Sequence, residues 1–232
     1  MAVRSFRSLA FCTSVLGALA LTQGCADDGV SLHMICPVPP TIADMACTYD
    51  AASTLCVLDG VMNLGSTSTY VSELKVQSGL RARARDVPPQ GEPNGVQLHS
   101  ATVELRTTLG ERLVFLADAL GKPVENPFKV VVSGYVTPSG SNIVGVQMMT
   151  AAHSAQLRNS AQDNTPKYPE IIAAVKLQGT TDGLEDVESG EYVWPIRLVG
   201  EGTEPPDMHC VPEMPTCGRL GQDQFADVTC AK

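Results

Sequence analysis

The feature that most constrains the fold is a period-two alternation of apolar and polar residues through the middle of the chain. In residues 69–77, Leu74 and Val76 fall on one face, and Glu73 and Lys75 fall on the other. Such alternation is typical of a half-buried β-strand, because successive side chains of a strand point to opposite faces. Similar patterns predict further strands at 96–107, 112–116, 128–137, 143–150, 169–180 and 191–199.

Two of these segments contain an irregularity. In 96–107 the apolar parity changes near His99-Ser100, which predicts a β-bulge. Pro195 in the last segment has no backbone N–H, so we expect it at a sheet edge or a bulge. Residues 151–161 fit either a short helix or a loop.

Six or seven strands with hardly any helical periodicity predict an all-β fold. The hydrophobic fraction of 44% is enough for a core, and 16 Pro with 20 Gly provide turns. The natural packing is an immunoglobulin-like β-sandwich, which we expect over residues 69–200. The Cys-Trp-Cys core pattern of antibody domains is missing, so the prediction concerns architecture alone. We expect residues 25–68 to be an irregular N-terminal segment and residues 201–232 to be a Cys-rich C-terminal segment.

The N-terminus has the pattern of an export signal. Arg4 and Arg7 precede an apolar run of thirteen residues from Leu9 to Leu21. That run is too short to cross a bilayer, which takes about 20 residues, but it fits the apolar part of a signal peptide. We therefore expect residues 1–24 to be removed on export.

The next residues predict a lipid anchor. Thr22-Gln23-Gly24-Cys25 resembles a bacterial lipobox, whose cysteine receives a diacylglycerol. Thr22 stands where leucine is usual. We expect Cys25 to carry acyl chains such as palmitate and to anchor the protein in the bacterial envelope. The alternative is ordinary signal cleavage with Cys25 as a thiol. Ala26 after the cysteine is consistent with the outer membrane.

The charge excludes some partners. The formal net charge is −9, and removing the two arginines of the signal gives −9 − 2 = −11. A nucleic-acid-binding protein needs a basic patch, and an anionic lipid surface repels such a charge. We therefore expect no nucleic-acid partner and no electrostatic docking on lipid headgroups.

The cysteines predict disulfides. One of the eight leaves with the signal and Cys25 is assigned to lipid, so six remain in an oxidising compartment. Six cysteines allow 15 pairings, which the sequence leaves open. They form one cluster near each end, and we expect at least one cross-link between the clusters, worth about 4–5 kcal/mol in the chain-entropy model. Zinc is the alternative, although no paired Cys-x-x-Cys spacing occurs. The six are Cys36, Cys47, Cys56, Cys210, Cys217 and Cys230.

Several segments in order resemble a known family. They read "TYVSELKVQSGL", "NGVQLHSATVELR", "NPFKVVVSGYV", "AAVKLQGTTDGLEDVESGEYVWPI" and, in the tail, "CGRLGQDQFADVTC". The chain is similar here to uncharacterised secreted lipoproteins of myxobacteria, a family without an assigned activity. The resemblance covers most of the mature chain. It implies an envelope location and an all-β fold, and it transfers no functional residues.

Catalytic signatures are missing. The chain has no nucleophile elbow, P-loop, dinucleotide fingerprint or His-Glu-x-x-His motif. Ser154 follows His153, but neighbouring strand residues point to opposite faces. We therefore expect His33, His99, His153 and His209 to be solvated loop or edge residues, with no catalytic residues and no cofactor.

Two charged features are candidate binding sites. Arg81, Arg83 and Arg85 would line one face of an extended chain, where they could contact an acidic partner or keep a strand edge from pairing. Between two predicted strands, carboxylates could hold Ca²⁺, or they could line a solvated connection that turns at 181–183. The weak calcium candidates are Asp182, Glu185, Asp186 and Glu188.

Two classes of function therefore remain. The first is a non-enzymatic envelope lipoprotein that acts as an interaction or structural module, with an envelope protein as a possible partner. The alternative is an envelope hydrolase or carbohydrate-binding domain with a site built from loops. Sugar binding needs exposed aromatic rings, and Tyr135 and Tyr168 are the candidates. A histidine that bonds a carboxylate and a hydroxyl within a cleft would favour the alternative.

Overall fold

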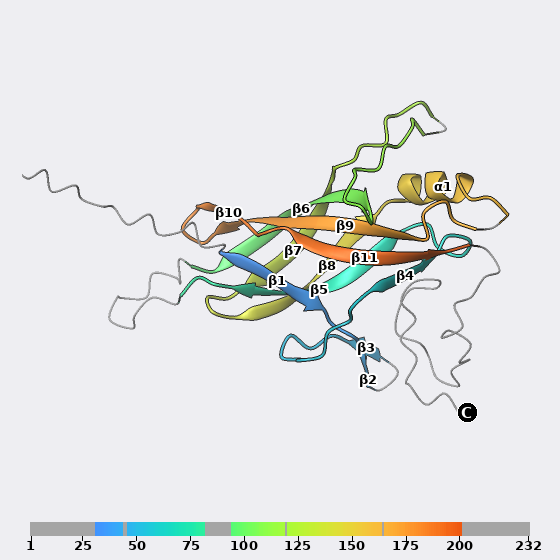
Figure 1. Cartoon of the computed structure of the whole chain (residues 1–232). Helices are drawn as coiled ribbons and strands as arrows, with labels where there is room; N and C mark the ends of the chain where they lie inside the picture. Colours follow the sequence, from blue (N-terminus) through green and yellow to red (C-terminus); the bar gives the residue numbers. More distant parts are fainter. Residues whose placement is uncertain (1–30, 44–45, 82–93, 119, 164, 201–232) are drawn as a thin grey trace, which may run out of the picture.

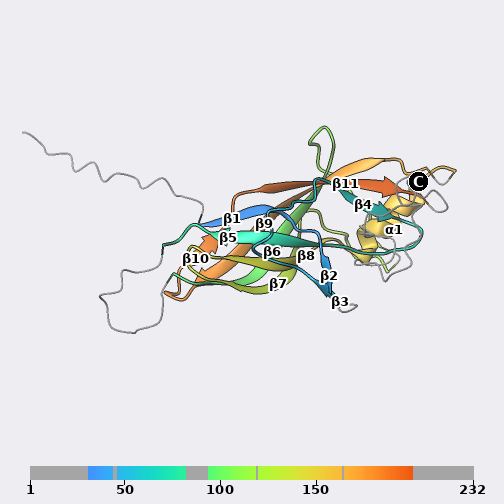
Figure 2. The same cartoon turned by 90° about the horizontal axis from the view of Figure 1, so that it is seen from below.

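The computed structural model describes residues 31–43, 46–81, 94–118, 120–163 and 165–200. Within them, two β-sheets run along the same long direction and enclose an apolar core, so the predicted β-sandwich is confirmed (Figures 1 and 2). The signal, Cys25 and the tail at 201–232 lie outside the described residues.

The smaller sheet is antiparallel and has the order β1-β5-β8. It consists of β1 (Leu32–Pro37), β5 (Tyr70–Ser78) and β8 (Ser141–Met149). In β5 every second residue from Tyr70 to Ser78 is buried. The predicted strand phase is therefore correct, with Leu74 and Val76 facing the core.

The larger sheet has the order β4-β11-β9-β6-β7, and β10 pairs with β9 beside this path. The β4–β11 pair is parallel and the others are antiparallel. Two further strands, β2 (Thr41–Ala43) and β3 (Ala46–Thr48), form a separate pair. The strands of the larger sheet are β4 (Gly60–Asn63), β6 (Val96–Thr107), β7 (Phe128–Val136), β9 (Glu170–Thr181), β10 (Asp186–Glu188) and β11 (Tyr192–Val199).

Both predicted irregularities occur. The register of β6 shifts between Leu98 and Ser100 against both of its neighbours, which confirms the β-bulge. Pro195 pairs with Ile172 of β9, and β4 joins β11 only from Ile196 onward. Pro195 thus lies where one side of β11 is still an edge. At this position its missing N–H breaks no pairing with β4.

The centre of the core joins three strands. Trp194 of β11 donates its indole N–H to the Tyr70 hydroxyl at 3.2 Å, and both side chains are buried. A Cβ at Gly60 of β4 would overlap the Tyr70 ring and hydroxyl. Glycine at this position therefore lets β4 approach the aromatic pair.

A short helix, α1 (Ala151–Asn159), follows β8. This resolves the helix-or-loop alternative for 151–161. Its N-cap is Thr150, which has extended backbone angles. The described part of the chain holds no helix with the length and apolarity needed to cross a bilayer.

Three predictions need correction. Residues 25–68 are not simply irregular, because β1 and β4 from this segment complete both sheets. The two sheets contain nine strands among the described residues, not six or seven. Residues 112–116 form no strand; Arg112 makes an isolated bridge with Arg106 and the segment leaves the sheet. The first two errors share a cause: short strands gain their stability from distant partners, as β4 does from β11.

The disulfide prediction is confirmed for the cysteines that the structure describes. Cys36 at the end of β1 bonds Cys56. Cys47 in β3 is also disulfide-bonded.

Candidate functional site

The most unusual feature of the surface is a protruding arm between β6 and β7, made of residues 112–118 and 120–126. Figure 1 shows it rising obliquely from the end of β6, beside α1. A tight turn over residues 107–111 precedes the arm. In this turn Thr107 N–H donates to the Glu111 carbonyl at 2.8 Å, and Gly110 N–H donates to the Thr107 carbonyl at 2.9 Å.

The tip of the arm repeats this turn. Asp118 N–H donates to the Lys122 carbonyl at 2.8 Å, and Gly121 N–H donates to the Asp118 carbonyl at 2.9 Å. Both turns place glycine at a positive φ, 84° at Gly110 and 76° at Gly121, which glycine adopts without steric cost. Each turn carries a leucine directly before its glycine, and these leucines, Leu109 and Leu120, are 86% and 81% exposed.

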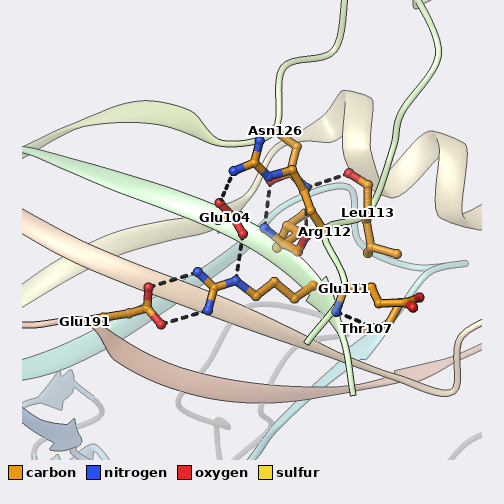
Figure 3. A network of polar contacts seen from close by, with 9 residues as sticks. Glu104, Thr107, Glu111, Arg112, Leu113, Asn126 and Glu191 are labelled. Carbon is orange, nitrogen blue, oxygen red and sulfur yellow. Dashed lines mark hydrogen bonds and ion pairs between the residues drawn. The ribbon is translucent and has the colours of Figure 1, made fainter. Parts of the chain in front are cut away.

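Asn126 clamps the base of the arm to β6 (Figure 3). Its side-chain oxygen accepts from Leu105 N–H at 2.8 Å, and its amide nitrogen donates to the carbonyls of Leu105 and Leu113 at 2.7 and 2.8 Å. Leu113 N–H also donates to the Leu105 carbonyl at 2.9 Å. One side chain thus replaces the strand pairing that β7 cannot provide before Phe128.

Charged side chains beside the clamp join the arm to the outer face of the larger sheet (Figure 3). Arg106 makes two parallel hydrogen bonds to Glu191, at 2.7 and 2.9 Å, and donates its Nε–H to Glu104 at 2.7 Å. Arg112 reaches the other oxygen of Glu104 at 2.8 Å. Hydrogen bonds from Arg106 lower the pKa of both carboxyl groups, so both carboxylates stay charged in neutral solution.

Helix α1 holds the arm from the other side. The Gln156 side chain accepts from Leu116 N–H at 2.7 Å and donates to the Leu116 carbonyl at 2.6 Å. Phe115 packs edge-on against the His153 ring, with 4.6 Å between centroids. Because these contacts fix the backbone, the arm presents a defined face to solvent.

That face is aliphatic. Val114, Leu116 and Leu120 are 88%, 77% and 81% exposed, while Leu113 is buried and Phe115 is half-buried. Aliphatic side chains grouped on a held, protruding segment are typical of an interaction site. The arm is therefore the candidate functional site.

His153 and Ser154 do not form a catalytic pair. His153 is buried, which corrects the expectation of a solvated side chain. Its Nδ1 lies 2.7 Å from the Thr150 hydroxyl, and its Nε2 lies 3.0 Å from the Glu125 carbonyl, which can only accept. Ser154 donates its own proton to the Thr150 carbonyl. Burial lowers the pKa of His153, so the imidazole is neutral and links α1 to the arm.

His99 and Ser100 meet at the β6 bulge. His99 Nδ1 lies 2.9 Å from the Ser100 hydroxyl, which donates to the Gln178 side-chain oxygen at 3.0 Å. The Gln178 amide nitrogen donates in turn to Glu188 at 3.1 Å. Since the hydroxyl proton goes to Gln178, Nδ1 of His99 is the donor toward Ser100. A base that activates a serine accepts the hydroxyl proton, so this hydrogen bond has the opposite direction.

The calcium candidates are dispersed. Asp182 accepts from the Tyr135 hydroxyl at 2.6 Å, and Asp186 accepts from the Thr180 hydroxyl at 3.2 Å. Glu188 is engaged by Gln178 and lies 3.5 Å from Lys176. Among the described residues, no three histidine, cysteine, aspartate or glutamate side chains gather as a metal site would require. Thus Glu185, the fourth candidate, belongs to no such group.

The other candidates are separate from the arm. Arg81 is exposed, and Arg83 and Arg85 lie outside the described residues. Tyr135 is 39% exposed and its hydroxyl is bound to Asp182. Tyr168 is half-buried with Lys167 over its ring. The two tyrosines therefore have different surroundings, Tyr135 against Asp182 and Tyr168 beneath Lys167.

The sequence contains a signal for the arm that strand patterns alone overlook. Residues 107–111 (TTLGE) and 118–122 (DALGK) share one pattern. Each begins with a hydroxyl or carboxyl residue, and a Leu-Gly pair and a charged residue follow after one variable position. Two such turns around the short run "LVFLA" predict a hairpin that leaves the sheet.

Comparisons of this chain with protein-family models, curated proteins and solved structures find no match.

Proposed function

We propose that this protein is an exported, lipid-anchored envelope protein that acts as a non-enzymatic interaction module, with the arm as its contact surface. The export signal and Cys25 motivate the location, which we propose to be the outer membrane. The similarity to secreted myxobacterial lipoproteins agrees with that location. We also propose that the sandwich is of the immunoglobulin-like kind.

The observation that carries the proposal is the exposed aliphatic face of a fixed arm. Exposing Val114, Leu116 and Leu120 together costs free energy in water, since each would gain about 1.5–3 kcal/mol on full burial. Asn126 and Gln156 hold the arm in place, so these side chains stay displayed. A binding partner would recover that free energy.

Photo-cross-linking in living cells tests the contact surface. A photo-reactive amino acid replaces Leu116 or Leu120, and the matched control replaces Leu184, which is 86% exposed in the turn before β10. We expect protein or lipid adducts at the two arm positions and few at Leu184. Equal labelling at all three positions, or none on the arm, would contradict the proposed contact surface.

Detergent partition tests the anchor independently. We expect the mature protein in the detergent phase, with an acylated Cys25 at the N-terminus of its first peptide by mass spectrometry. Recovery in the aqueous phase with an unmodified Cys25 would refute lipidation and leave the arm proposal standing.

The alternative is an envelope hydrolase or a carbohydrate-binding domain, although the hydrogen bond between His99 and Ser100 runs in the wrong direction to activate the serine. Hydrolysis of ester or glycoside substrates that disappears in Ser100→Ala would support a hydrolase. Hydrolysis that survives this substitution would count against it.

A further inference from the structure

We infer that the arm inserts its aliphatic tip into the bilayer that holds the protein's lipid anchor, so that the sandwich lies along the membrane. The inference rests on the proposed function, because it names the partner of the same surface. It adds a second, protein-based membrane contact to the lipid at Cys25.

The first argument is the chemistry of the displayed side chains. Val114, Leu116 and Leu120 are purely aliphatic and lie on a protruding hairpin. Leu120 lies at the tip and Leu116 and Val114 lie farther down, so a protruding hairpin of this kind needs a partner that closes around it. The acyl boundary of a bilayer does so without a matching groove, and it accepts aliphatic groups to a depth of about 5–10 Å.

The second argument is the state of the backbone at the tip. The N–H groups of Leu120 and Lys122 both donate to the Asp118 carboxylate, at 2.9 and 2.8 Å. Those of Asp118 and Gly121 bond within the same turn. Leu116, farther down the arm, has both backbone groups bound by Gln156. Unpaired backbone groups are costly in lipid. The N–H groups of these five residues are all paired and would therefore not add this cost in the bilayer.

The third argument is charge. Arg112 and Lys122 balance Asp118 and Glu125, so the charge of the arm is 2 − 2 = 0, while the whole chain has −9. The arm is therefore a part of this acidic protein that an anionic surface repels little. Lys122 directly after the tip can extend its ammonium group to lipid phosphates while its stem follows the apolar boundary.

The fourth argument is the length of the tether. Cys25 lies six residues before Ser31, a distance of at most about 20 Å when the chain is extended. The sandwich is therefore held close to the bilayer. β1 begins at the end of the sandwich opposite the arm, since Leu32 pairs with Ser78. The arm rises to one side of the strand direction (Figure 1), so a side-on orientation brings both ends to the membrane.

Depth-dependent fluorescence quenching tests the inference on the full mature, lipidated protein. The protein is reconstituted into phosphatidylethanolamine and phosphatidylglycerol vesicles, with or without brominated acyl chains. Leu120→Trp is the reporter, and Leu58→Trp, 83% exposed on the segment before β4 and away from both the arm and the start of β1 in sequence, is the matched control. The native Trp194 is buried, so its background is common to both proteins.

We expect bromolipids to quench Leu120→Trp and to leave Leu58→Trp bright, with emission of the arm reporter shifted to shorter wavelength. Adding Leu116→Asp to the reporter should reduce the quenching, whereas adding Leu58→Asp, at a site 83% exposed on another segment, should not. Equal melting temperatures would show that these variants remain folded.

Other outcomes identify other occupants. An unquenched Leu120→Trp overturns bilayer insertion. If the same position then cross-links to a protein in cells, the interaction module stands with a protein partner; if that protein is this chain itself, the arm is a self-association surface. If no adduct forms either, the inference and the proposed contact surface fail together.

Discussion

At the scale of single residues, His153 shows how burial changes the role of a titratable side chain. Thr150 supplies a hydroxyl at 2.7 Å and a backbone N–H at 3.4 Å to Nδ1, so this nitrogen must be the acceptor. Nε2 then holds the proton and donates it to the Glu125 carbonyl. A second proton has no place in this arrangement, which agrees with the lowered pKa of the buried imidazole.

This histidine predicts a pH dependence of stability. The unfolded chain binds a proton near the ordinary histidine pKa of 6.5, and the folded protein does so only at lower pH. The free energy of unfolding is therefore undiminished above about pH 6.5. It falls as the pH decreases below that value, by at most about 1.4 kcal/mol per pH unit.

Denaturant unfolding between pH 7.5 and 5 measures the effect. His153→Gln should be less stable at neutral pH. Its free energy of unfolding should also lack the part of the pH dependence that comes from His153. Glu104 and Glu191 act at lower pH, since their pKa values fall below 4.5. An identical slope in both proteins would disprove the assignment to His153.

Asn126 predicts a loss of stability at the base of the arm. Asn126→Ala removes three hydrogen bonds. At about 1 kcal/mol for each bond, the free energy of unfolding should fall by about 3 kcal/mol. Asn159→Ala, an exposed site at the end of α1, is the control and should change it by less than about 0.5 kcal/mol. Similar values for both variants would show that the clamp contributes little.

At the scale of elements, the arm departs from the rule that alternation marks a half-buried strand. The run 112–116 alternates as β5 does, but the Gln156 side chain, and not a neighbouring strand, binds the backbone N–H and carbonyl of Leu116. The same pattern therefore buries Leu113 and exposes Val114 and Leu116. Local sequence could predict an extended conformation here, but not which neighbours would cover it.

Gln156 gives a test of how the arm is held. Gln156→Ala should speed hydrogen exchange at the arm amides, Leu116 above all, with little change in melting temperature because the contact is exposed. Gln156→Glu keeps the acceptor for Leu116 N–H, so its exchange rate at Leu116 should lie between those of the unsubstituted protein and the alanine variant. Unchanged exchange in the alanine variant would mean that Asn126 and the turns hold the arm without the helix.

At the scale of the whole molecule, a disulfide ties the segment before β4 to β1 of the smaller sheet. Cys36–Cys56 closes one loop, and Cys47 of β3 is also disulfide-bonded. With Cys25 assigned to lipid, this favours the cross-link expected between the two cysteine clusters. It would leave the other two cysteines of the tail to pair with each other.

Mass spectrometry checks this arrangement. Reduction of the mature protein should add the mass of six hydrogens, two for each of three disulfides among the six cysteines. Peptide mapping should join Cys47 to Cys210, Cys217 or Cys230. A gain of four hydrogens or fewer would contradict three disulfides.

Sequence alone was enough to predict the β character of the chain, the inward phase of β5, the bulge in β6 and the oxidation of Cys36 and Cys56, although it left their pairing open. These follow from local properties, namely the alternation of side chains along a strand and the redox compartment that an export signal implies. The fold was needed to show that β4 pairs with β11 far along the chain, that His153 is buried, and that Leu116 and Leu120 of the arm face solvent. Burial depends on which distant segments pack against a residue, and a local pattern contains no record of them.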